Sequence, residues 1–294
     1  MSRYRYLVGL FFLFLLASCS NANKGTIVTE NGISLKFHDL SSTDISLFEN
    51  CILNVNLLAR NKKDKVIFSS KYQGLFGVSS FYYDSLLVNS PLHYVFEKTF
   101  TGDSLSFKVL RSTFYSSFFG SNDLLHNSSS KEDDTLDITL RIVGFNSYEE
   151  QGGFTTSLIS KAIDEERGMV QEKQIEWKDK FVNIYENNGL YAIKLASSNI
   201  INNPEDSVSQ FLALNYTLED FSGRLVYTTN GKSEYYDLSL NNQLLGGFNI
   251  LARKYERGDS IMAIIPSSLL FGKRGSFVNQ IPPYCPLKVN LKIN

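Results

Sequence analysis

The chain has 294 residues and a formal net charge of −1, because its 29 basic side chains are balanced by 30 acidic ones. That balance argues against a nucleic-acid partner, which would favour a basic face. With only three cysteines and three histidines, neither a disulfide scaffold nor a histidine-rich metal site is indicated.

Residues 1–18 have the form of a cleavable signal peptide. Two arginines precede an apolar run from Leu7 to Ala17, which is shorter than the about 20 residues that cross a bilayer. The run closes on the letters LASC, which resemble the box that lipoprotein-processing enzymes recognise, so Cys19 is predicted to be the lipid-anchored first residue of the mature protein. The alternative is an ordinary signal peptide that happens to contain a cysteine. Since no acidic run follows Cys19, we expect an outer-membrane lipoprotein that faces the periplasm.

The polar residues 19–31 are predicted to tether the first domain, residues 32–148, to the membrane. Apolar and polar residues alternate through much of this domain, which is typical of half-buried strands. One short helix is expected before Gly102, because four residues recur at helical spacing: Leu92, Val95, Phe96 and Thr99. Residues 115–134 are expected to form a long loop.

Residues 149–184 are charged and carry apolar side chains at roughly helical spacing, which predicts a helical connector. Glu176 and Lys180 stand four residues apart, in the favourable order for a helical ion pair. Gly168 is expected to interrupt this helix. The second domain, residues 185–294, is expected to begin with a strand at residues 190–195.

The second domain repeats the first. Residues 64–70 resemble residues 223–229 at an offset of 159, and residues 136–142 resemble residues 287–293 at an offset of 151. Between them, Gly-Asp-Ser at residues 102–104 recurs at residues 258–260, an offset of 156. The offsets drift in one direction, as changes in loop length would produce. The stripe of the short helix also recurs, at Phe248, Leu251, Ala252 and Tyr255.

Each copy therefore combines one short helix with several alternating segments. This pattern predicts an α+β protein of two tandem domains, each an antiparallel sheet packed on a short helix, joined by the helical connector.

Several short motifs follow one another in the second copy. They are Asn215-Tyr216 in an early strand, QLLGGF at 243–248 opening the helix, Gly258-Asp259, Ile265-Pro266-Ser267, Phe271-Gly272 and Ile281-Pro282-Pro283. In this order and spacing, residues 189–294 resemble an FKBP-type peptidyl-prolyl cis-trans isomerase domain. Two such domains behind a lipoprotein signal also resemble envelope lipoproteins of the Bacteroidetes type, including gliding-associated isomerase-like ones.

The resemblance implies an apolar pocket for a proline ring. Tyr216 takes the position of the family's strand tyrosine, Phe248 that of the large ring at the pocket floor, and Ile281 that of the apolar residue before the double proline. Leu244 and Leu245 take the positions of a backbone donor and an apolar side chain that hold the bound peptide. The full predicted set is Tyr216, Val226, Tyr235, Leu244, Leu245, Phe248, Phe271 and Ile281. For each residue taken alone, the alternative is ordinary core packing.

Three positions of the second copy depart from the family pattern. Tyr227 stands where an aspartate is usual, Phe271 replaces a tyrosine whose hydroxyl bonds the ligand, and Val289 replaces a wall phenylalanine. The first copy departs further, with Leu57 at the tyrosine position and no Ile-Pro-Pro loop. We therefore interpret the first copy as a non-catalytic structural or binding domain.

Prolyl isomerisation needs no nucleophile, metal or cofactor, because the catalyst has only to desolvate and twist an amide. The sequence contains no HExxH, GxSxG, CxxC or P-loop motif, and we predict no cofactor and no metal. The leading hypothesis is an isomerase and folding helper of the cell envelope that acts on proline-containing polypeptides. The alternative is a non-catalytic FKBP-like module that binds a partner in an envelope complex.

Overall fold

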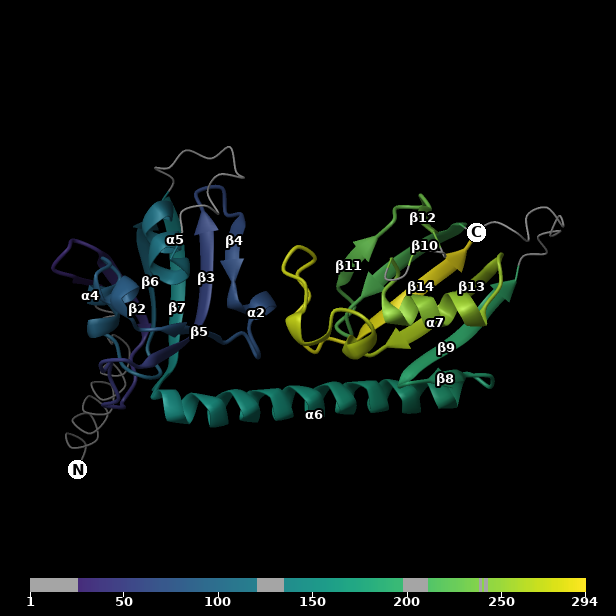
Figure 1. Ribbon diagram of the computed structural model, residues 1–294, viewed down its shortest axis with the longest axis horizontal. Coiled ribbons are helices and arrows are strands. Elements are labelled where there is room, and N and C mark those ends of the chain that lie inside the picture. The colour runs from purple at the N-terminus through teal and green to yellow at the C-terminus, as the bar shows by residue number, and fades with distance from the viewer. Residues whose placement is uncertain (1–25, 121–134, 198–210, 238–239, 241–242) are drawn as a thin grey trace, which may run out of the picture. The chain divides into compact units, whose positions relative to one another are not determined.

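In the computed structural model, the described residues are 26–120, 135–197, 211–237, 240 and 243–294. The predicted signal peptide and Cys19 lie outside them. The chain divides into two compact units, the first Met1–Phe68 with Phe81–Asn146 and the second Ser69–Ser80 with Ser147–Asn294. Each contains an antiparallel sheet packed with helices, so the predicted α+β class is confirmed (Figure 1).

The first sheet has the strand order β1-β2-β6-β7-β3-β4, and β5 pairs with β3. Its strands are β1 (Thr26–Val28), β2 (Ser34–Asp39), β3 (Ile52–Asn61), β4 (Val66–Ser69), β5 (Ser79–Tyr82), β6 (Ser104–Leu110) and β7 (Thr135–Asn146). The helices along this stretch are α2 (Ser70–Gln73), α3 (Ser85–Val88), α4 (His93–Glu97) and α5 (Arg111–Phe119).

Two details differ from the predicted elements of this unit. Thr26–Val28, the described end of the predicted tether, is strand β1, because a turn with Gly32 at φ 83° folds it back onto β2. The predicted loop 115–134 begins as the end of α5, and its residues 121–134 lie outside the described ones.

The second sheet has the order β11-β10-β14-β13-β9-β8, and β12 pairs with β10. Its strands are β8 (Tyr185–Asn187), β9 (Leu190–Ser197), β10 (Phe211–Glu219), β11 (Leu225–Thr228), β12 (Glu234–Asp237), β13 (Asp259–Ile265) and β14 (Leu287–Ile293). Its helices are α6 (Tyr148–Lys180), α7 (Gly246–Lys254) and the 3₁₀ turns η3 (Ser267–Leu269) and η4 (Gly272–Arg274).

The two sheets share one topology, which confirms the internal repeat. Written from its other end, the order of the second sheet corresponds to the first strand by strand. The pairing agrees at single residues, because Leu57 pairs with Leu140 in the first sheet as Tyr216 pairs with Leu291 in the second. Leu57 and Tyr216 are therefore equivalent positions.

The repeated Gly-Asp pair builds the same turn in both units. Gly102 and Gly258 have φ of 101° and 91°, a region that glycine occupies without steric cost. Both aspartates are buried, and each accepts a hydrogen bond from the backbone N–H three residues earlier, at 2.8 Å for Asp103 and 3.0 Å for Asp259. The motif therefore fixes the step from the short helix into β6 or β13.

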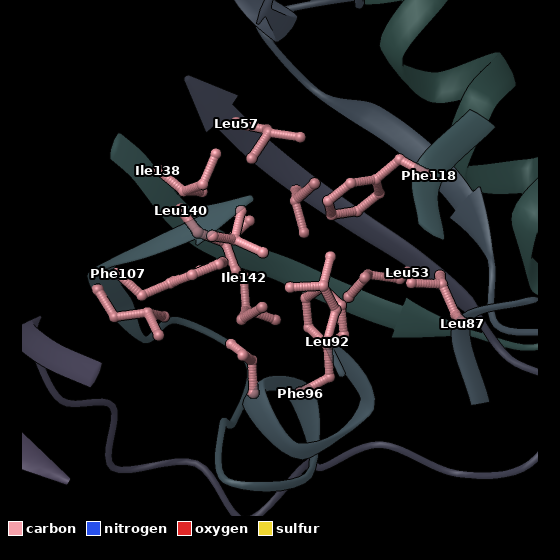
Figure 2. Packing of buried hydrophobic residues seen from close by; sticks show 14 of the residues in the cluster. Leu53, Leu57, Leu87, Leu92, Phe96, Phe107, Phe118, Ile138, Leu140 and Ile142 are labelled. Carbon is pink, nitrogen blue, oxygen red and sulfur yellow. The ribbon is translucent and has the colours of Figure 1, made fainter. Parts of the chain in front are cut away.

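The core of the first unit lies between its sheet and its helices. Leu53, Leu57 and Leu140 of the sheet meet Phe96 of α4 and Phe118 of α5 in one buried cluster (Figure 2). The inner face of the second sheet forms a similar cluster with α7, which includes Phe248, Leu251 and Ile261.

Helix α6 is continuous, so the predicted interruption at Gly168 is wrong. A capping box joins Ser147 and Glu150 at its start, and lysines occupy its last turn. A glycine inside a helix costs only about 1 kcal/mol. Packing offsets that cost, because Trp177 lies on the outer face of the second sheet and is 5% exposed. Of the described helices, none combines the length and apolar character needed to span a membrane.

Candidate functional site

Helix α7 places Phe248, the ring predicted to form the pocket floor, against the second sheet. Its apolar side chains recur at helical spacing, so Phe248 and Leu251 point together into the core. The helix starts close to β13 because position 247 has no side chain. A Cβ there would lie 2.5 Å from Cγ2 of the buried Ile265. Gly247 therefore sets how closely Phe248 approaches the sheet.

The aromatic centre of the site is a contact between β10 and α7. The ring of Tyr216 lies 4.7 Å from that of Phe248 and 5.6 Å from that of Tyr227 on β11. Phe248 is buried, whereas both tyrosines are only half-buried. The cluster thus has an apolar floor and a partly exposed wall.

Most of the predicted set contributes to the same cluster. Phe248 and Ile281 belong to its buried core, and partly buried members pack around them: Tyr216, Val226, Leu244, Leu245 and Phe271. Val289, where the family has a wall phenylalanine, is fully buried in the sheet.

Tyr235 is the exception, and the prediction that it lines the pocket is wrong. It is 75% exposed, and its two neighbours on β12 point to the opposite face of the strand. Those neighbours, Glu234 and Tyr236, are the ones whose side chains reach Tyr216. The letters EYYD do not reveal this, because only the pairing of β12 with β10 decides which residue faces inward.

Glu234, which sequence reasoning missed, holds the polar edge of the site. Its Oε2 accepts hydrogen bonds from the hydroxyls of Tyr216, at 2.8 Å, and Tyr236, at 2.5 Å. Its Oε1 accepts one from the hydroxyl of Tyr227. Three strands, β10, β11 and β12, thus each supply a tyrosine to one carboxylate.

These hydrogen bonds shift the pKa values of the whole group. Partial burial of Glu234 opposes its ionisation, but the three hydroxyl donors outweigh that effect and lower the pKa of the carboxyl. Burial, followed by its bonds to Tyr236 and Glu234, raises the pKa of Tyr216. Burial and then Glu234 raise the pKa of Tyr236 to about 12. The arrangement at neutral pH is therefore one carboxylate and three protonated tyrosines.

A tight loop presents Ile281 to the cluster. Gly275 has φ 62°, and a Cβ there would lie 2.3 Å from the carbonyl oxygen of Ile281. Ser276 and Ile281 exchange two backbone hydrogen bonds of 2.8 Å, and Arg224 donates to the carbonyl oxygen of Gln280 at 2.8 Å. These contacts fix the conformation of the loop that leads into the Ile-Pro-Pro segment.

The equivalent region of the first unit is filled with apolar side chains. Leu57 and Leu92, at most 2% exposed, are the counterparts of the tyrosine and phenylalanine that contact each other in the second unit. Where the second unit has η3 and η4, the first has α5, whose Phe118 ring lies 6.1 Å from that of Phe96 (Figure 2). The first unit therefore lacks an aromatic pair at the positions equivalent to Tyr216 and Phe248. Its interpretation as a non-catalytic structural or binding domain stays a prediction.

In the described part of the chain, no three His, Cys, Asp or Glu side chains gather as metal ligands. Cys51 and Cys285 are free, one in each unit. Burial raises the pKa of the Cys51 thiol, and it raises that of Cys285 to about 11. Both thiols are therefore poor nucleophiles at neutral pH.

No protein-family model matches the chain, and no curated protein matches it in sequence. Among solved structures, a peptidyl-prolyl cis-trans isomerase from Pseudomonas syringae is similar at 16% identity and a TM-score of 0.36, over 46% of this chain and 92% of its own. A wheat protein with three FKBP domains is similar at 11% identity and a TM-score of 0.31, over 90% of this chain and 94% of its own. FkpA from Escherichia coli is similar at 18% identity and a TM-score of 0.33, over 50% and 73%. These are distant similarities, and an activity does not follow from them.

Proposed function

We propose that the second unit binds proline-containing polypeptides and accelerates cis-trans isomerisation of their X–Pro bonds. The observation that carries the proposal is the apolar cluster in which Tyr216 and Phe248 lie with their ring centroids 4.7 Å apart and to which Ile281 also belongs. This cluster unites the residues of the FKBP-like sequence motifs.

The chemistry suits an apolar surface. Amide resonance sets a barrier of about 18–20 kcal/mol to rotation. A surface that takes the proline ring and removes water from the amide disfavours the planar, charge-separated ground state relative to the twisted transition state. The proposed rotation requires no nucleophile and no metal.

A specific observation favours the alternative, a non-catalytic module that binds a prolyl segment. The three tyrosyl hydroxyls at the site all donate to Glu234. Phe271 offers no hydroxyl of its own. A twisted prolyl carbonyl would then lack a side-chain donor from these residues, which would weaken catalysis more than binding.

The test is the isomerisation rate of a prolyl peptide, measured by NMR exchange with the mature chain and two variants. Phe248→Leu removes the ring contact with Tyr216, and Phe96→Leu makes the same change at a buried phenylalanine of the first unit. We expect Phe248→Leu to lower kcat/KM about three- to tenfold, the worth of an aromatic pair, and the control to leave it unchanged.

If the folded mature chain binds the prolyl peptide but does not accelerate its isomerisation, the binding-module hypothesis would replace the isomerase hypothesis. An equal loss of activity in both variants would contradict the assignment of the active site to the second unit. Circular dichroism of each variant shows whether it is folded.

We further propose that Cys19 anchors the protein in the outer membrane, with both units facing the periplasm. The support is the run of apolar residues that ends on LASC at residues 16–19. Polypeptides that fold outside the cytoplasm would be the clients, since prolyl steps take tens of seconds. Proteins of envelope machinery are the partners that the binding alternative implies.

A further inference from the structure

The edge of the candidate site offers hydrogen-bond acceptors only. A tyrosyl hydroxyl has one proton, and those of Tyr216, Tyr227 and Tyr236 are all directed at Glu234. Only the lone pairs of the three hydroxyl oxygens are left for a ligand. A carboxylate has about four acceptor positions, so three donors leave one of them open. A ligand group that contacts this edge must therefore bring donors.

The same edge carries an uncompensated negative charge. Glu234 is half-buried, and no ion pair among the described residues includes it. Three other carboxylates in or next to the second sheet are paired: the buried Asp259 with Lys194 at 2.8 Å, and the half-buried Asp220 with Arg224 at 2.8 Å and Glu219 with Lys288 at 3.2 Å. Withdrawing an unpaired carboxylate from water is costly. Glu234 thus has the hydrogen bonds that such a group needs but lacks the cation.

The acceptor edge adjoins the apolar floor. Tyr216 spans both, because its ring contacts Phe248 while its hydroxyl contacts Glu234. A proline ring seated on the floor would place the neighbouring side chain of the same peptide near the carboxylate. Lysine and arginine side chains consist of an apolar stem and a charged head that carries donors only, which matches the order of the two surfaces.

We propose that Glu234 is a specificity-determining residue, and that the second unit selects prolyl segments in which a lysine or arginine flanks the proline. The proposal rests on the proposed function, since it names the polypeptides that the same site takes. The three tyrosines act as positioning residues, because they hold the carboxylate ionised and oriented at the edge of the floor.

The experiment compares two fluorescent tetrapeptides, one with arginine and one with norleucine on both sides of the proline, titrated into the mature chain. We expect the arginine peptide to bind about tenfold more tightly, the ratio that a hydrogen bond to a charged group supports. Glu234→Gln keeps the side-chain shape but removes the charge, and it should abolish the ratio by weakening the arginine peptide more than the norleucine peptide. Glu172→Gln removes the same charge from an exposed position of α6 and should preserve the ratio.

A salt titration of the unmodified chain gives an independent readout if Glu234→Gln does not fold. Added salt should weaken the arginine peptide and leave the norleucine peptide unchanged. Equal affinities for the two peptides, or a ratio that survives in folded Glu234→Gln, would overturn the role of Glu234 and leave the prolyl site in place. If neither peptide binds, the proposed function is contradicted, and the proposed selection of basic segments fails with it.

Discussion

Replacing Gly247 with alanine tests the close approach that positions Phe248. The added Cβ would lie 2.5 Å from Cγ2 and 3.0 Å from Cδ1 of Ile265, which is fully buried and cannot move aside without displacing the core. Gly246 supplies a matched control in the same helical turn. A Cβ at position 246 would meet Leu269 at 3.5 Å, which is an ordinary contact.

The magnitude follows from the difference between the two variants. Neither glycine has a positive φ, so alanine suits both backbones, and the gain in helix propensity of up to about 1 kcal/mol is common to both. Overpacking a core costs typically about 1–3 kcal/mol, and only Gly247→Ala incurs it. We therefore expect the free energy of unfolding of Gly247→Ala to lie about 1–3 kcal/mol below that of Gly246→Ala.

The assay is denaturant unfolding followed by tryptophan fluorescence. Trp177 is the only tryptophan of the chain and is buried against the second sheet, so its emission reports on the second unit. Combining Gly247→Ala with Ile265→Ala should cost less than the sum of the single changes, since the shortened side chain removes both contacts. Equal stability of the two glycine variants, or strict additivity in the double variant, would refute the steric reasoning.

Three further predictions concern charge, catalysis and anchoring. Burial disfavours the ionised form of Asp259, but hydrogen bonds from Lys194, the backbone N–H of Glu256 and Ser197 outweigh it and hold the pKa of the carboxyl below its ordinary value. The stability that ionised Asp259 contributes is present above the pKa of the unfolded state and is lost as pH falls through the pKa of the folded state. Asp259→Asn should therefore lower the free energy of unfolding at neutral pH and reduce its fall at acid pH in a series of unfolding measurements. An unchanged fall at acid pH would contradict this. Phe271→Tyr supplies a hydroxyl donor and should raise the isomerisation rate about tenfold with little change in Tm. If this variant folds and binds the peptide but does not accelerate isomerisation, the result would favour the binding module. Cys19→Ser should abolish metabolic labelling with a fatty acid, and equal labelling of both proteins would end the lipoprotein hypothesis.

Much of the second unit's inner surface could be predicted from local sequence. The motifs around Tyr216 and Phe248 place both residues in the pocket that the family resemblance implies, and their rings are in contact in the structure. Gly168 shows where local reasoning failed, because a glycine lowers helix propensity whereas the packing of Trp177 on the sheet keeps α6 intact. Glycine's cost is local and small, and the packing that offsets it comes from residues far along the chain.

The sequence by itself determined the internal repeat, the short helix of each copy and the glycine that ends that helix. The helix and its end depend on a few neighbouring residues, whose spacing or backbone freedom permits one local structure. Only the tertiary structure decided that Glu234 and Tyr236, rather than Tyr235, reach the site, and that Phe118 fills the corresponding region of the first unit. Side chains alternate across a strand, so a shift of one residue in pairing exchanges the two faces. That pairing is fixed by strands distant in the sequence, and the carboxylate of Glu234 gains its three hydroxyl donors only when they come together.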